Sequence, residues 1–127
     1  MASGEPTQVS FRGVIASVAT QEEAYEWLLD KFLAVKSEFS ERERREINRR
    51  SRTRLYLSRS PEELWDRSTH LIEERRYKKM SGGWYANMNL DLETKSGVLR
   101  RFAGIAKLNE GEDWTWDLIP PSEALDI

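Results

Sequence analysis

The first part of the chain carries hydrophobic residues in two different periods. From Val9 to Val18 they are frequent and β-prone, with an interruption at Gly13, so we expect a first strand with a bulge or a break. The segment Thr20-Gln21-Glu22-Glu23 has the form of a capping box, and apolar residues recur behind it at helical spacing. The pattern therefore predicts a strand followed by an amphipathic helix over 21–37.

The middle of the chain contains two further helix start signals. Ser40-Glu41-Arg42-Glu43 is a second capping box, and it opens a predicted helix over 41–50 whose only large apolar residue is Ile47. A helix with so little to bury packs by one edge and is otherwise solvated or bound. Residues 52–57 alternate as in a half-buried strand. Ser60-Pro61-Glu62-Glu63 then predicts a helix over 61–76.

The last third of the chain reads as three antiparallel strands. Apolar and polar residues alternate from Trp84 to Leu92, and a hairpin loop is expected over 93–97. A return strand is expected over 98–108, with a bulge near Gly104 where the alternation of inward and outward side chains changes. A last strand is expected from Trp114 to Leu118.

These elements predict the fold class α+β, with residues 1–127 forming a single domain. The expected architecture is an antiparallel β-meander of the three C-terminal strands plus one or two N-terminal strands. Two to three helices are expected to pack mainly on one face of it. The segments 1–7 and 120–127 are expected to be flexible tails, because they are rich in small, polar and Pro residues.

Composition narrows the classes of protein and of chemistry. The 127 residues include no cysteine, which excludes disulfides, thiol catalysis and thiolate metal sites. The first residues show neither a basic start nor an apolar run, and no apolar stretch approaches the roughly 20 residues that span a bilayer. We therefore expect a soluble cytoplasmic protein that contacts no membrane and binds no cofactor.

Charge is distributed unevenly along the chain. Residues 42–79 hold 13 basic and 7 acidic side chains, a net charge of +6, whereas the remaining residues sum to −8. Most of the basic excess comes from arginines within 42–54, and arginine grips phosphates and carboxylates in a bidentate way. Because an aromatic residue lies beside them, we expect a nucleic-acid surface made of Arg42, Arg45, Arg49, Arg50, Arg52, Arg54 and Tyr56.

Two alternatives to nucleic-acid binding stay open for the arginines. Glu41/Arg45, Glu46/Arg50 and Arg42/Glu46 are i,i+4 pairs that would stabilise a solvated helix without any ligand. Acidic residues elsewhere in the chain, or in a second copy, would also neutralise them.

The polar side of the expected meander is a second candidate surface, formed by Tyr85, Asn87, Asn89 and Asp91. This face, or the acidic C-terminal segment, would suit a partner protein, as in an immunity-type inhibitor, or a homodimer. An antiparallel sheet also has one solvated face without any function.

Catalytic patterns are weak. The single histidine, His70, lacks a second histidine to complete a metal site. Asp91 and the triplet Glu93-Thr94-Lys95 resemble in arrangement the acidic and lysine residues of metal-dependent nucleases, but a polar hairpin loop explains them equally. We therefore expect no catalytic residues and no bound metal. A small non-enzymatic binding protein is the leading hypothesis, and a metal-dependent hydrolase or nuclease ranks third.

Overall fold

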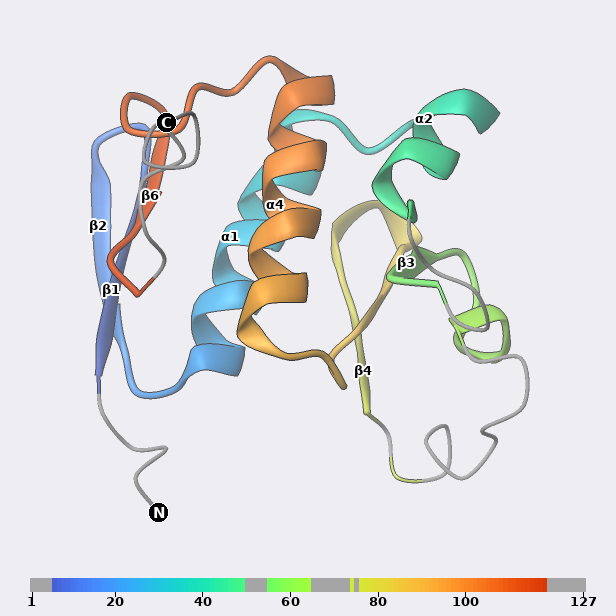
Figure 1. Cartoon of the computed structure of the whole chain (residues 1–127), viewed down its shortest axis with the longest axis horizontal. Coiled ribbons are helices and arrows are strands. Elements are labelled where there is room, and N and C mark those ends of the chain that lie inside the picture. Colours follow the sequence, from blue (N-terminus) through green and yellow to red (C-terminus); the bar gives the residue numbers. More distant parts are fainter. Residues whose placement is uncertain (1–5, 50–54, 65–73, 75, 119–127) are drawn as a thin grey trace.

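The computed structural model of the protein describes residues 6–49, 55–64, 74 and 76–118. Within these residues, three α-helices and two three-stranded antiparallel sheets form one α+β domain. Helices α1 (Gln21–Val35) and α4 (Leu92–Ala106) lie side by side in the middle (Figure 1). One sheet covers one side of this helix pair, and the other sheet lies on the opposite side together with α2 (Glu41–Ile47). The helices are therefore sandwiched between two sheets, instead of covering one face of a single sheet.

The first sheet joins the two ends of the described chain. It consists of β1 (Thr7–Phe11), β2 (Val14–Val18) and β6 (Trp114–Trp116), in the order β2-β1-β6. Between β1 and β2, Arg12 and Gly13 have φ angles of 49° and 89°, the left-handed values that a two-residue hairpin turn requires. The expected interruption at Gly13 is thus a complete reversal of the chain, and the predicted single strand is a hairpin.

Helix α1 confirms the prediction from the capping box. The Thr20 hydroxyl accepts a hydrogen bond from the Glu23 N–H at 3.1 Å, and the Glu23 carboxylate accepts one from the Ala19 N–H at 2.9 Å. The helix ends at Val35, two residues before the predicted end. Phe32 on its buried face contacts aromatic rings from three other elements, with centroid distances of 6.0 Å to Phe11, 5.6 Å to Phe102 and 5.4 Å to Trp114.

The predicted meander is wrong, because most of it is the 15-residue helix α4. The alternating segment forms only the three-residue strand β5 (Tyr85–Asn87). The residues expected as a hairpin loop and a return strand over 93–108 are helical up to Ala106. Asp91 caps this helix by accepting the Thr94 N–H at 2.8 Å. Its buried residues Val98 and Leu99 lie four and three positions before the buried Phe102, so the three form one stripe that packs on α1.

The second sheet is built from three short strands, β3 (Leu57–Ser58), β4 (Tyr77–Lys79) and β5, in the order β3-β5-β4. The predicted last strand exists as β6, but it pairs with β1. It therefore does not extend the sheet that contains β5, and the predicted strand order is wrong.

Helix α2 begins at the predicted capping box around Ser40 and ends at Ile47, before the expected residue 50. Pro61–Leu64 is a single 3₁₀ turn, and most of the predicted helix over 61–76 lies outside the described residues. The predicted tails also lie largely outside them, although Thr7 already belongs to β1. In the part of the chain that the structure describes, no helix combines the length and the apolar character needed to cross a membrane.

Candidate binding surfaces

The arginines of α2 are only partly available to a ligand. Arg45 pairs with Glu41 at 3.2 Å, and Arg49, just after the helix, pairs with Glu46 at 3.5 Å. Arg42 is exposed and forms no ion pair with any described residue. The remaining candidates Arg50, Arg52 and Arg54 lie outside the described residues. The described arginines of this surface are therefore exposed, and two of the three are balanced by glutamates of the same segment.

Two arginines outside the predicted set enclose Trp84. The guanidinium carbons of Arg59 and Arg44 lie 4.0 Å and 5.3 Å from the Trp84 ring centroid. Arg59 also donates a hydrogen bond to the Gly82 carbonyl, and the indole N–H of Trp84 donates to the Ser37 carbonyl at 2.6 Å. Since Trp84 is buried, these cations hold α2 and the Gly82 loop against the domain and offer no open stacking platform.

Tyr56 lies inside the molecule, and the predicted stacking role on the surface is not compatible with that position. Only 5% of the residue is exposed, and Arg101 lies 6.0 Å from its ring centroid. The Tyr56 backbone is fixed by Asn48, whose side-chain oxygen accepts its N–H at 2.6 Å and the N–H of Leu57 at 3.0 Å. The Asn48 amide group donates in turn to the Arg44 and Leu57 carbonyls. This segment thus connects α2 to β3.

The four residues of the predicted protein-interaction face do not form one exposed face. Asn87 is buried; its side chain donates to the Leu55 carbonyl at 3.1 Å and accepts the Asn89 N–H at 2.8 Å. The Asn89 side chain accepts from Arg76, and Asp91 caps α4. Tyr85 is half-buried, with its ring 5.8 Å from that of Tyr77. Three of these four polar side chains therefore hydrogen-bond within the domain, because the chain does not continue as a flat sheet.

The acidic and lysine residues proposed for a nuclease are also dispersed. Lys95 is buried on α4 and donates a hydrogen bond to the Gln21 side-chain oxygen at 2.9 Å, whereas Glu93 is exposed. Burial lowers the pKa of Lys95, and the nearby carboxylate of Glu22 opposes this shift. No group of three or more His, Asp or Glu residues within the described ranges is placed to hold a metal ion. His70 lies outside those ranges.

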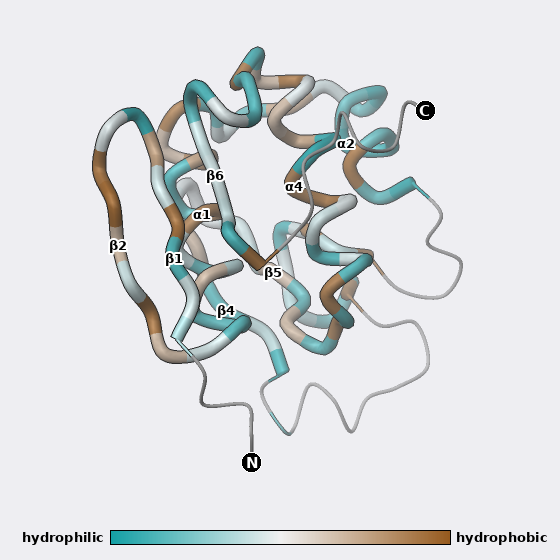
Figure 2. The backbone as a smooth tube through the Cα atoms, turned by 60° about the vertical axis from the view of Figure 1, so that its left-hand side comes forward, coloured by the Kyte–Doolittle hydropathy of each residue, from teal (hydrophilic) through white to brown (hydrophobic). Residues whose placement is uncertain are grey.

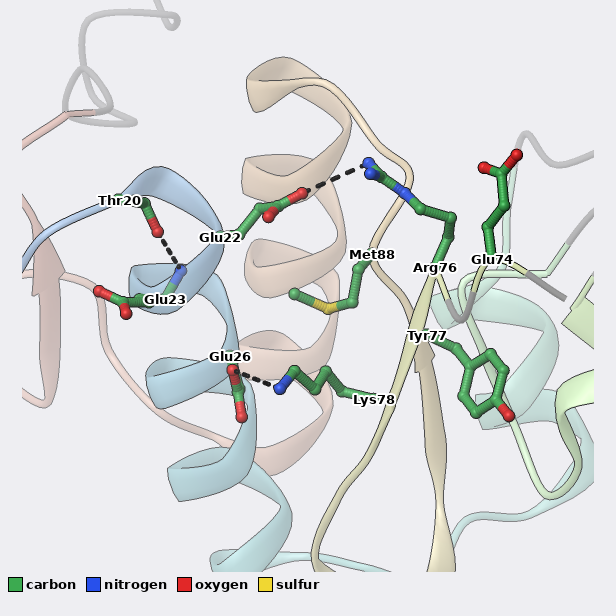
Figure 3. Close-up of a pocket in the computed structure, with 9 residues that line it drawn as sticks. All are labelled: Thr20, Glu22, Glu23, Glu26, Glu74, Arg76, Tyr77, Lys78 and Met88. Carbon is green, nitrogen blue, oxygen red and sulfur yellow. Dashed lines mark hydrogen bonds and ion pairs between the residues drawn. The ribbon is translucent and has the colours of Figure 1, made fainter. Parts of the chain in front are cut away.

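A groove of about 390 Å³ lies between the start of α1 and β4 (Figure 3). Arg76 and Lys78 reach across it to Glu22 and Glu26, at 3.5 Å and 4.0 Å. Glu23 also lines the groove, and its carboxylate accepts a hydrogen bond from the Ala19 N–H. The charged groups that line this groove therefore hold α1 against β4, and the arrangement assigns no ligand to it.

The outer edge of β2 is a feature that the sequence analysis missed. β2 forms one end of the first sheet, and no described strand pairs with its outer side. Val14 and Ile15 are 58% and 66% exposed, and Figure 2 shows hydrophobic parts of β2 at the periphery of the molecule. The signal was present in the sequence: reading Arg12-Gly13 as a hairpin turn would have separated β2 from β1.

The hydrogen bonds of β1 show which backbone groups of β2 point toward this edge. Arg12 N–H donates to the Asp113 carbonyl at 2.7 Å, and Asp117 N–H donates to the Gln8 carbonyl at 3.0 Å. Even-numbered residues of β1 therefore bond toward β6, and odd-numbered ones bond toward β2. Since Val9 is opposite Ala16, the N–H and C=O groups of Ile15 and Ser17 point outward, away from β1.

Comparisons with known proteins assign no family to the chain. No family model matches it, and neither a curated protein nor a solved structure is significantly similar to it. Its function must therefore be inferred from the chemistry of these surfaces.

Proposed function

We propose that the protein is a small non-enzymatic protein-binding module that takes up a strand of a partner protein along β2. The observation that supports this function is the outer edge of β2, which no strand of the described residues pairs with and which combines outward backbone groups with exposed Val14 and Ile15. Sheet edges of soluble proteins are usually protected by charged side chains, proline or a bulge. The sequence of β2, VIASV, contains none of these.

Strand addition also explains how such a short surface would bind specifically. The added strand forms backbone hydrogen bonds, which contribute affinity, and alternate side chains contribute selectivity. Ile15 lies on the outer face of the sheet beside Ser10, whereas Val14 lies on the inner face beside Phe11. A bound strand would thus cover one large apolar side chain on each face.

Photo-crosslinking in the host cell tests this proposal. A photoreactive amino acid at Ile15 should give a covalent adduct of defined mass, identified by mass spectrometry. The same group at Thr115, which is exposed on β6 away from this edge, is the control. Adducts at neither position, or equally at both, would contradict a docking role for β2.

A second candidate function is nucleic-acid binding through the exposed side of α2. Arg42 and Arg45 are three positions apart on α2 and therefore share one side of the helix. Arg49 follows in the turn just after it, and all three arginines are exposed. The ion pairs of Arg45 and Arg49 are themselves largely exposed. Such pairs contribute only about 0–1 kcal/mol, and a phosphate would therefore replace the glutamates at little cost. Arg50, Arg52 and Arg54 would extend the same basic segment.

An electrophoretic mobility shift assay with single-stranded and duplex oligonucleotides distinguishes this function. We expect binding that weakens steeply with salt and is lost when Arg42, Arg45 and Arg49 are replaced by alanine. The matched control replaces Lys31, Lys78 and Lys79, which removes the same charge from other surfaces and should retain binding. Equal losses in both triple variants would indicate a general charge effect and contradict a site on α2.

A further inference from the structure

We infer that the strand bound along β2 is β2 of a second copy, so that the protein forms a two-fold symmetric homodimer with one continuous sheet. This inference rests on the proposed docking role of β2 and specifies the partner. Each copy would contribute its three strands, in the order β6-β1-β2 followed by β2-β1-β6.

The direction of the backbone fixes the register of this pairing. Only Ile15 and Ser17 direct their N–H and C=O groups outward, so these residues must form the hydrogen-bonded pairs of an antiparallel ladder. A two-fold axis at Ala16 places Ile15 of each copy opposite Ser17 of the other. Both pairs then exchange two backbone hydrogen bonds, and Ala16 lies opposite its own equivalent in a non-hydrogen-bonded pair.

The side chains of β2 are self-complementary in this register. Val14 and Val18 are equally distant from Ala16, so the exposed Val14 of one copy would pack against Val18 of the other. Like charges directly opposite each other destabilise a strand pair, and β2 carries no charge. The small side chain at Ala16 also suits the close approach of two strands at a non-hydrogen-bonded pair.

Charges at both ends of the paired strands favour the same arrangement. Counting outward from the axis at Ala16, Arg12 of one copy lies level with Thr20 of the other. The exposed acidic residues Glu22 and Glu23 follow in the first turn of α1. Within one copy, Glu22 pairs with Arg76 at 3.5 Å and Arg12 with Asp113 at 3.9 Å, both through partly exposed side chains. The two-fold axis would therefore bring opposite charges, and not like charges, near each other at both ends.

The other edge of the sheet explains why assembly would stop at two copies. The outward carbonyl of Trp114 on β6 already accepts the Gly111 N–H at 2.7 Å, and β6 has only three residues. Because β2 is the only described strand with an open edge of five residues, the contact uses the same surface on both copies and closes on itself. A single strand pair is smaller than a standard interface, so we expect a dissociation constant on the order of micromolar.

Disulfide trapping tests the register directly, because the chain contains no cysteine. Residues at a non-hydrogen-bonded antiparallel pair have Cα atoms about 4.5 Å apart, within the range that a disulfide bridges. We expect Ala16→Cys to give a covalent dimer under mild oxidation. The control Val14→Cys is more exposed but lies opposite Val18, so it should stay monomeric. Equal dimer formation by both variants would indicate random collision and overturn the inference.

Sedimentation velocity over about 1 to 300 µM protein provides a test without cysteine. We expect the unmodified chain and Ser17→Ala to dimerise with rising concentration. Ser17→Pro should remain monomeric, because it removes an outward N–H that β1 does not use. Ile15→Lys should also remain monomeric, because a charged side chain protects a sheet edge without changing the backbone. Circular dichroism verifies that all variants fold.

The outcomes separate this inference from the proposed function. A monomer at every concentration, together with a crosslink from position 15 to another protein, would overturn the homodimer and retain the docking role of β2. A monomer without any such crosslink would overturn both.

Discussion

Tyr25 and Lys95 carry polar groups that are buried next to each other on α1 and α4. The ammonium of Lys95 lies 5.9 Å from the Tyr25 ring centroid and donates to Gln21. The Tyr25 hydroxyl, in contrast, has no hydrogen-bond partner in the described part of the chain. Burial raises the pKa of Tyr25 and lowers that of Lys95. Both shifts favour the neutral side chain, which is the usual effect of low polarity around an ionisable group.

Replacing Tyr25 by phenylalanine should not destabilise the protein. An unsatisfied buried hydroxyl costs about 1–3 kcal/mol, so we expect the free energy of unfolding of Tyr25→Phe to be equal or about 1 kcal/mol higher in urea titrations at neutral pH. A clear loss of stability would show that the hydroxyl has a stabilising partner.

The same variant has a predictable pH dependence. With its pKa raised in the folded state, Tyr25 stays protonated while the unfolded chain ionises above about pH 10, so the unmodified protein loses stability there. Tyr25→Phe lacks this loss, and its advantage should grow from about pH 10 upward. The lowered pKa of Lys95 acts in the opposite direction, since its stability contribution rises toward alkaline pH. It affects both proteins alike and cancels in the comparison.

Among the elements, α1 and α2 could be predicted from the sequence and α4 could not. The starts of α1 and α2 are encoded locally, by Thr20 and Ser40 with a glutamate three residues later. The segment of α4 contains Gly97, Val98 and Gly104, which favour a strand or a bulge when considered alone. Packing of Val98, Leu99 and Phe102 against α1 outweighs that local preference. Asp91 is a typical helix-capping residue, but it also continues the alternation of apolar and polar residues that precedes it, and that alternation favours a strand.

Glycine substitutions in α4 test its helical structure. A side chain at Gly104 would meet nothing within 4 Å, so we expect Gly104→Ala to raise the free energy of unfolding by about 0.5–1 kcal/mol. At Gly97 the added carbon would lie 3.2 Å from the Arg101 guanidinium, and the gain there should be smaller. Thermal unfolding of the two variants gives the comparison. Destabilisation by Gly104→Ala would contradict a regular helix at this position.

At the scale of the whole molecule, the pairing of strands could not be predicted. The sequence indicates that Trp114 and Trp116 face one side of a strand, but not which strand lies beside it. In the structure that neighbour is β1, and Ser10 and Thr115, which are 105 positions apart in the chain, hydrogen-bond at 2.7 Å. The docking surface depends on the same information, because β2 is an edge only once β6 occupies the other side of β1. The arginines were identified from the sequence, but their ion pairs and the burial of Tyr56 were not.

Substitution of Trp116 tests how much the packing of β6 contributes to the free energy of unfolding. It is buried, and its indole N–H donates to the Thr7 hydroxyl at 3.0 Å. We expect Trp116→Ala to lower the free energy of unfolding by about 3–5 kcal/mol. Leu118, 45% exposed just after the same strand, is the matched control and should cost less than about 1 kcal/mol when replaced by alanine. Similar losses in urea titrations of the two variants would contradict a large contribution of the buried face of β6 to stability.

The contact between β1 and β6 also determines when the first sheet can be completed during synthesis. The hairpin and α1 leave the ribosome before the strand that covers the other side of β1, which is translated about a hundred residues later. Contacts of such high sequence separation form slowly, since a long loop must close first. Until β6 has been translated, both edges of the nascent hairpin are open to other chains, so this interval is the step most vulnerable to misassembly.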